Sequence, residues 1–351
     1  MDEKISMSDL AKELGVSKVS VSKALNDKEG VSDELREKIK KLASDKGYRF
    51  NNSARSLKTD KQFNVGILIS EKFILDKEAY YFSVCGEMIR KLNELGYSGI
   101  MEIITYQTEN EGILPRVYNE NKVDGLIVLG QMGNAYLKKI ESISIPFIFF
   151  DFYVKDSTAD CIVTDNFFSG YCLTNQLIEQ GHKNLAFVGS IHATSSIQDR
   201  FLGFYKSLIE NNLFLAKKNL IEDRDEQGKL TPLKLPDVLP TAFVCNCDRV
   251  ALTLMETLKK MGKKVPEDCS VVGFDNSIFS TITDPQITTV DNNIPEMVGT
   301  AVKIITKKIL NPQRKYGRIM ISGSIIPRNS VKNLFDFTTE SRSLNPELDI
   351  H

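Results

Sequence analysis

Metal ligands are scarce in this sequence. Only three of its 351 residues are histidine, and its six cysteines include no C-x-x-C pair. A zinc site needs such ligands at close spacing, so we expect neither a metal nor another cofactor. The simplest interpretation of the cysteines is buried free thiols in a reducing compartment, which predicts a cytoplasmic protein.

Long apolar segments are also missing. No run approaches the roughly 18 apolar residues that a membrane span needs. The N-terminus, MDEKISMSDL, is charged and lacks the apolar region of a secretory signal. Apolar residues make up 42% of the chain and charged residues 26%, as in ordinary globular proteins. The length predicts about two domains with a small extra module, and we expect no membrane partner.

Phosphate-binding and catalytic motifs are absent as well. The sequence contains no G-x-G-x-x-G, no G-x-x-x-x-G-K-[ST] and no G-x-S-x-G. His182 and His192 have no partner motif, and an isolated histidine near a turn is expected at the surface or as a capping group. These absences predict that the protein is not an enzyme.

Charge is distributed unevenly along the chain. The 45 Lys and Arg nearly balance the 46 Asp and Glu, which excludes a uniformly basic nucleic-acid coat. Residues 1–61, however, hold 14 Lys and Arg against 11 Asp and Glu, whereas the remainder holds 31 against 35. An acidic body with a mildly basic head points toward DNA, although lysine-rich faces are often only solvated surface.

The head has the pattern of a helix-turn-helix. Residues Ser6 to Asp9 form a capping box, Gly15 ends the first helix, and Ser17 caps a second at 18–25. A third helix is predicted from Val31-Ser32 to Gly47. The short second helix suits the major groove, and its hydroxyls and lysines suit phosphates and base edges. The alternative is a three-helix cap with incidental lysines.

Four segments of the head make a resemblance specific. They are MSDLAKELGVSKVSVSKALN at 7–26, VSDELR at 31–36, GYR at 47–49 and NNSARSLKT at 51–59. Together they resemble the lactose-repressor (LacI/GalR) family of transcriptional regulators, with the last segment matching the family's hinge helix. The resemblance implies a sequence-specific DNA-binding domain followed by a hinge that orders on DNA.

The resemblance also implies which residues contact DNA. Base edges are matched by Lys18, Val19 and Lys23, phosphates by Ser17, Ser22 and Asn26, and the minor groove by Leu57 with Ala54 packed beside it. An apolar wedge such as Leu57 unstacks a base step and kinks the duplex. Two departures stand out: Lys23 replaces an arginine and gives up bidentate recognition of guanine, and Phe50 replaces a proline before the hinge.

The rest of the chain predicts an α/β body. Short apolar runs alternate with helical patterns. The predicted strands are 65–70, 99–104, 125–129, 147–150, 162–164, 185–189, 242–245 and 270–274, and the predicted helices include 84–95, 169–180, 197–211 and 250–261. Buried strands that alternate with helices favour parallel sheets covered on both faces. Eight strands suit two doubly wound lobes with a cleft, and ligands of such sheets bind at the carboxyl ends of strands.

The body resembles the same family and the periplasmic sugar-binding proteins. The matching pieces include VDGLI at 123–127, GHKNLAFVG at 181–189, DRFLGF at 199–204 and VPEDCSVVGFD at 265–275. The implied domains are a helix-turn-helix at 1–50, a hinge at 51–61, a two-lobed ligand-binding and dimerisation domain at 62–331 and a polar tail at 332–351. The N-lobe would span about 62–164 and 292–322, and the C-lobe about 165–291 and 323–331.

The family resemblance places effector-binding residues at the ends of strands. They are Tyr81, Phe82, Asp151, Phe152, Arg200, Asp248 and Asp275, with Phe167 and Phe279 as further aromatic walls. Aromatic faces that stack on ring surfaces, with carboxylates and a guanidinium for hydroxyls, suit a sugar. Some of these residues have structural alternatives: Tyr81 and Phe82 as core aromatics, Asp248 as a helix cap and Arg200 as a surface ion-pair partner. Cys247 stands where many members have a ligand-binding asparagine.

The function implied is a homodimeric transcriptional repressor on a near-palindromic operator, controlled by a small carbohydrate-type effector between two lobes. Ligand binding would change the angle between the lobes and so move the two hinges. Three alternatives stay open: control by a protein partner, control by a nucleoside or purine, and a cytoplasmic sugar-binding protein without regulatory function.

Overall fold

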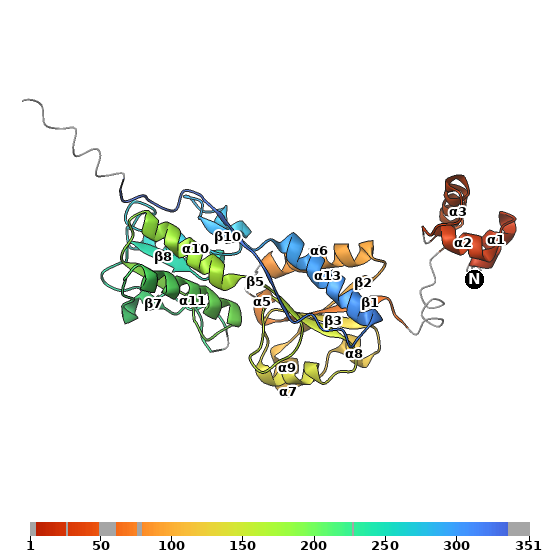
Figure 1. The fold of residues 1–351 in the computed structure, drawn as a ribbon, viewed down its shortest axis with the longest axis horizontal. Coiled ribbons are helices and arrows are strands. Elements are labelled where there is room, and N and C mark those ends of the chain that lie inside the picture. The colour runs from red at the N-terminus through yellow and green to blue at the C-terminus, as the bar shows by residue number, and fades with distance from the viewer. Residues whose placement is uncertain (1–4, 26, 49–60, 76–78, 227, 336–351) are drawn as a thin grey trace, which may run out of the picture. The chain divides into compact units, whose positions relative to one another are not determined.

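The computed structural model describes residues 5–25, 27–48, 61–75, 79–226 and 228–335. Contacts divide the chain into two units, Met1–Gln62 and Phe63–His351, which are described separately (Figure 1). Within the described residues, no helix combines the length and apolar character that a membrane-spanning segment requires.

The first unit is a three-helix domain. Its helices are α1 (Met7–Glu13), α2 (Lys18–Leu25) and α3 (Asp33–Asp45). The predicted capping box is confirmed, because Ser6 accepts from the Asp9 amide and the Asp9 carboxylate accepts from the Ser6 amide at 2.9 Å. Gly15 turns the chain between α1 and α2 with φ of 63°, where glycine costs little.

A small apolar core holds these three helices together. Its fully buried members are Leu10, Ala11, Val21, Ala24, Ile39 and Ala43. Leu14, Leu25, Leu35 and Leu42 are half-buried and pack around that core. The remaining face of α2 is therefore available to solvent.

The second unit begins with an N-lobe around a six-stranded parallel sheet. The strand order is β11-β5-β4-β3-β1-β2. Helices α6 and α13 cover one face, and α7, α8 and α9 cover the other (Figure 1). The strands are β1 (Asn64–Ser70), β2 (Ser98–Ile104), β3 (Gly125–Leu129), β4 (Phe147–Phe150), β5 (Cys161–Thr164) and β11 (Arg318–Ile321). The helices are α5 (Lys72–Leu75), α6 (Ala79–Glu94), α7 (Tyr106–Glu111), α8 (Arg116–Asn119), α9 (Asn134–Glu141) and α13 (Ile294–Leu310).

The C-lobe is built on a four-stranded parallel sheet with the order β7-β6-β8-β9. Its strands are β6 (Leu185–Val188), β7 (Leu220–Ile221), β8 (Ala242–Cys245) and β9 (Ser270–Val272). Its helices are α10 (Asn166–Glu179), α11 (Ser195–Glu210) and α12 (Asp248–Lys260), with short 3-10 turns at Lys217–Asn219 and Ile278–Ser280. An antiparallel pair, β10 (Thr289–Asp291) and β12 (Ser324–Ile326), joins it.

The chain passes between the lobes three times. The passages follow β5, β10 and β11, each of which is succeeded by an element of the other lobe. The predicted doubly wound α/β body is thus confirmed. Predicted helices start too late: α10 begins at Asn166 rather than at 169, because Asp165 caps it by accepting from the Phe168 amide.

Helices α10 and α11 cross at two glycines. A Cβ on Gly203 would lie 2.0 Å from the Phe167 carbonyl oxygen, and one on Gly170 would lie 2.6 Å from that of Arg200. Only glycine lets the two backbones approach this closely. The contact fixes the start of α11, and Arg200 lies on that helix.

We expect Gly203→Ala to lower the free energy of unfolding by at least about 2 kcal/mol, because the added methyl overlaps a backbone oxygen that cannot move alone. The midpoint of urea unfolding measures this. Gly86→Ala on α6 is the matched control, because nothing lies within 4 Å of its Cβ position. Alanine has the higher helix propensity, so Gly86→Ala should be neutral or stabilising. Equal effects of the two substitutions would contradict the packing argument.

Candidate functional site

Helix α2 presents the residues that were predicted to read DNA. Val19 is 65% exposed, an unusual position for an apolar side chain on a small domain, and Ser17 and Lys18 are exposed beside it. Ser17 also caps α2, because its Oγ accepts from the Ser20 amide at 3.0 Å. The helix is anchored through Val21 and Ala24, both fully buried. The exposed side chains of its first turn therefore project from a helix whose opposite face is fixed in the core.

The other predicted DNA contacts differ in placement. Ser22 and Lys23 are half-buried, and the Lys23 ammonium lies 2.8 Å from the Cβ position of Gly30. Lys23 thus lies along the loop that follows α2 and has less reach than Lys18. Asn26, Phe50, Ala54 and Leu57 fall outside the residues that the structure describes.

A pocket lies between the two lobes of the second unit, where strands of both sheets end. The N-lobe contributes Phe73, Tyr80, Tyr81 and Asp151. The C-lobe contributes Thr194, Ser196, Ile197, Arg200, Arg224, Asn246, Cys247, Arg249, Asp275, Ser277 and Phe279. Asp151 follows β4, Asn246 follows β8 and Asp275 follows β9, so the pocket occupies the position expected for ligands of doubly wound sheets.

Asp151 supplies a buried carboxylate to this pocket. The Tyr81 hydroxyl donates to its Oδ2 at 2.9 Å, while Oδ1 is buried with no hydrogen-bond partner among the described residues. Burial raises the pKa of Asp151 to about 6, although the Arg200 guanidinium acts to lower it. A buried acceptor without a donor is costly, so Oδ1 is suited to a donor on a bound molecule.

Arg200 and Asp275 form an ion pair across the C-lobe wall of the pocket. Arg200 Nη2 lies 3.2 Å from Asp275 Oδ1, and its Nε donates to Asn166 at 2.7 Å. The guanidinium also stacks on Phe274, 3.8 Å from the ring centroid. Asp275 accepts from Asn292 at 2.9 Å. The pair is rigid and partly accessible, which suits recognition of adjacent hydroxyls.

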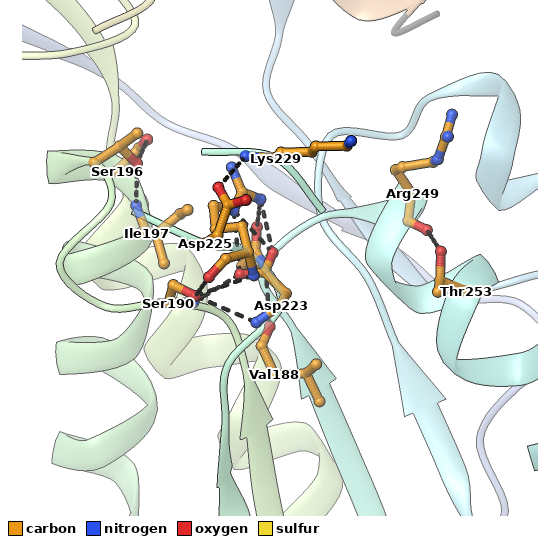
Figure 2. A network of polar contacts seen from close by, with 12 residues as sticks. Val188, Ser190, Ser196, Ile197, Asp223, Asp225, Lys229, Arg249 and Thr253 are labelled. Carbon is orange, nitrogen blue, oxygen red and sulfur yellow. Dashed lines mark hydrogen bonds and ion pairs between the residues drawn. The ribbon is translucent and has the colours of Figure 1, made fainter. Parts of the chain in front are cut away.

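A second arginine enters the pocket from the loop after β7. Arg224 Nη2 donates to Asp223 at 2.7 Å and to Asn246 at 3.3 Å. Asp223 is 1% exposed and also accepts from the Ser190 amide, as Figure 2 shows. Burial acts to raise the pKa of Asp223, but Arg224 and these donors hold it below its usual value. The network fixes the direction of the Arg224 guanidinium.

Three predicted aromatic ligand contacts lie outside the pocket lining. Phe152 is 1% exposed and stacks on Phe149 at 4.7 Å in the N-lobe core, so its prediction as a pocket residue is wrong. Phe82 is 45% exposed and does not line the pocket, because α6 turns it outward while Tyr80 and Tyr81 face in. Phe167 is likewise exposed and outside the pocket lining, whereas Phe279 lines it.

Asp248 is a structural carboxylate. It is fully buried, accepts from Ser277 and Thr289, and does not line the pocket. Burial raises its pKa to about 7, with a contribution from the Asp275 carboxylate. Its side chain does not cap α12, whose N-cap is Cys247, so the helix-cap alternative is wrong too. Asp248 instead fastens the loop after Asp275 to β10.

The sequence predicted that His182 would lie at the surface or act as a capping group, but the structure buries it. It is 1% exposed, and its Nε2 lies 3.0 Å from the Ser270 hydroxyl and 3.1 Å from the Lys332 carbonyl oxygen. It packs the segment after β12 against the C-lobe sheet. Nothing in this arrangement suggests catalysis.

Several pocket residues were missed by the sequence analysis. Tyr80, Arg224, Asn246, Arg249 and Ser277 all line the cavity. The rule that ligands bind at strand ends would have found Asn246, which directly follows β8. Arg224 comes from a loop that only the fold brings to the pocket, so no local pattern identifies it.

The pocket is small in this conformation. It encloses about 70 Å³, whereas small-molecule sites usually enclose about 300–1,000 Å³. Inter-lobe hydrogen bonds accompany this closure, because the Ser195 amide donates to Gln131 at 2.8 Å and the Tyr153 hydroxyl donates to Asp199 at 2.9 Å. The hydrogen bonds between the lobes thus hold the pocket in a narrow conformation.

Comparisons with family models divide the chain in the same way as its architecture. Residues 6–51 match the model for bacterial regulatory proteins of the lacI family. Residues 174–331 match the model for the periplasmic binding protein-like domain. The first match covers α1 to α3, and the second runs from within α10 through the rest of the C-lobe and includes α13 and β11.

Curated relatives match over nearly the full length. An HTH-type transcriptional repressor PurR from Histophilus somni is 28% identical over 341 residues, which is 93% of this chain and 98% of that protein. A ribose operon repressor from Haemophilus influenzae is 25% identical over 334 residues, which is 93% of this chain and 99% of that protein.

Solved structures share the fold. The lac repressor dimer bound to operator and the anti-inducer ONPF matches with a TM-score of 0.71 at 21% identity, covering 94% of this chain and all of that one. A transcriptional regulator CelR–cellobiose complex matches with a TM-score of 0.67 at 20% identity, covering 93% and 99%.

Proposed function

This chain belongs to the LacI family of bacterial regulatory proteins, and from that membership we propose that it is a transcriptional repressor. A small effector bound between its two lobes controls its affinity for DNA. Members of the family are DNA-binding transcriptional regulators and not enzymes. We further propose that the protein works in the cytoplasm as a homodimer on a near-palindromic operator. Each of its two DNA-binding domains contacts one half-site.

The proposed effector is a carbohydrate, and one observation carries this choice. The buried Asp151 Oδ1 has no donor among the described residues, and the Arg200–Asp275 pair lies in the same pocket. Buried carboxylate acceptors beside a guanidinium suit a ligand with several hydroxyl donors close together. The aromatic rings of Tyr80 and Phe279 supply stacking surfaces for a sugar ring.

The small cavity supports the coupling between effector and DNA. The volume of about 70 Å³ is small for a sugar, and we propose that the bound state has a wider spacing between the lobes. A ligand that binds one lobe arrangement better than another shifts the equilibrium between them. The change in lobe arrangement is then transmitted through the three crossover segments to the residues before β1, which connect the body to the DNA-binding head.

Calorimetric titration of the full-length protein with ribose, glucose and cellobiose tests this proposal, alongside operator binding with and without each sugar. We expect at least one sugar to bind and to change operator affinity by fivefold or more. A sugar that binds without changing operator affinity would contradict the regulatory role.

A nucleoside or purine is the second candidate effector, because the flat rings of Tyr80 and Phe279 and the Arg200–Asp275 pair also suit a heterocyclic base. Hypoxanthine, guanine, adenosine and guanosine belong in the same titration. Binding of a base in preference to every sugar would overturn the carbohydrate assignment while leaving the regulatory role intact.

Effector affinity should depend on pH through Asp151. The raised pKa of about 6 means that the neutral acid dominates below pH 6 and the carboxylate above it. Hydroxyl donors need the carboxylate, so affinity should fall about tenfold between pH 7.5 and pH 5. Calorimetry at several pH values measures the effect, and Asp151→Asn should bind weakly with a flat profile. An equally steep profile in that variant would exclude Asp151 as the cause.

A further inference from the structure

A narrow hollow adjoins the effector pocket at the interface of the lobes. It encloses about 30 Å³ and is lined by Lys72, Phe73, Ala193, Thr194, Arg224, Gly228 and Leu230. Three of these residues, Phe73, Thr194 and Arg224, also line the effector pocket. On its other side, Lys72 and Ala193 line a larger hollow of about 880 Å³. The narrow hollow is thus the junction between the pocket and the open cleft.

Two cations meet at this junction, one from each lobe. Lys72 lies in α5 of the N-lobe, and Arg224 lies in the loop after β7 of the C-lobe. They are the only charged residues among the described ones that line the hollow. The Lys72 side chain reaches across the interface, because its Cδ lies 3.8 Å from the Cβ position of Gly228.

The junction carries two positive groups, of which Arg224 is paired with the buried Asp223. Burial lowers the pKa of Lys72, and repulsion from Arg224 lowers it further, while Glu109 in the larger hollow opposes these effects. The Arg224 guanidinium is held in place from behind by the buried Asp223. A fixed guanidinium and a nearby ammonium in a partly dry gap make strong, charge-assisted hydrogen bonds to a phosphate.

We propose that the effector is a phosphorylated monosaccharide, with its sugar hydroxyls at Asp151 and its phosphate between Lys72 and Arg224. This inference rests on the proposed function and adds the ligand's charge to it. Because the two cations belong to different lobes, the phosphate bridges the cleft and sets the spacing of the lobes in the bound state. Because the narrow hollow adjoins the effector pocket, one ligand can place its sugar in the pocket and its phosphate between the two cations.

Calorimetry on the full-length protein tests the proposal with matched pairs of probes. The pairs are ribose and ribose 5-phosphate, glucose and glucose 6-phosphate, and fructose and fructose 6-phosphate, with inorganic phosphate as a further probe. The variants are Lys72→Gln and Arg224→Gln. Arg116→Gln is the control, because Arg116 is exposed on α8, pairs with Glu120 and lines neither the effector pocket nor the two adjoining hollows.

We expect one phosphorylated sugar to bind at least tenfold more tightly than its parent. Each cleft variant should weaken that phosphate ester by about tenfold to a hundredfold, which is the usual worth of a hydrogen bond to a charged group. Lys72→Gln should change the affinity for the parent sugar less than threefold, because Lys72 does not line the effector pocket. Arg224→Gln should weaken the phosphate ester at least fivefold more than the parent sugar, and Arg116→Gln should change neither.

Two results would overturn the inference. One is a parent sugar that binds as tightly as its phosphate ester, and the other is an equal loss of both ligands in the variants, which would indicate a merely structural role. Either leaves the proposed function standing. If no sugar, phosphate ester, nucleoside or base binds at all, the proposed function fails as well.

Discussion

Replacing Lys18 and Val19 together with alanine should lower operator affinity at least a hundredfold. Both side chains are exposed on the first turn of α2, and Val19 is 65% exposed without any packing role. Each good contact to a base edge contributes about 1–3 kcal/mol of discrimination. Fluorescence anisotropy on a duplex selected from a random-sequence pool measures the loss.

The two single substitutions should change different properties of operator binding. Lys18→Ala should reduce the slope of affinity against salt concentration, because a cation near the phosphates releases counterions. Val19→Ala should leave that slope unchanged and relax sequence preference. Lys38→Ala is the control: Lys38 is exposed on α3 and paired with Glu34 at 2.7 Å. If the control weakens binding as much as the double variant, α2 is not the reading helix.

Replacing Arg200 with methionine should abolish the effector response and destabilise the C-lobe. The guanidinium joins Asp275, Asn166 and the Asn246 carbonyl oxygen in one buried cluster. Removing one partner of a buried ion pair typically costs about 3–5 kcal/mol, because the other charge is left uncompensated. Denaturant unfolding measures the stability, and operator binding with and without effector measures the response.

A double variant separates stability from recognition. Arg200→Met combined with Asp275→Asn removes both charges, so more than half of the lost stability should return. The effector response should stay absent, because both recognition groups are gone, while operator binding remains within threefold of the wild type. A double variant that still responds to effector would show that this pair does not belong to the binding site.

The family resemblance explains which site residues could be predicted. Asp151, Arg200 and Asp275 were predicted because the family resemblance places effector contacts at these positions, and the structure brings them into one pocket. Phe152 shows the limit of the same reasoning. It lies one residue after Asp151, and backbone direction sends its ring into the core. At Asp151 the φ angle is 69°, a turn that no periodicity reports.

The amino-acid sequence alone determined the helix-turn-helix and the doubly wound body, because capping boxes, glycine turns and apolar runs act over a few neighbouring residues. Only the tertiary structure decided that Lys72 and Arg224, more than a hundred residues apart in the chain, line one hollow. It also decided that Asp248 fastens a loop and His182 a C-terminal segment. Such roles depend on contacts between residues far apart in the chain, within the C-lobe for Asp248 and His182 and between the two lobes for Lys72 and Arg224.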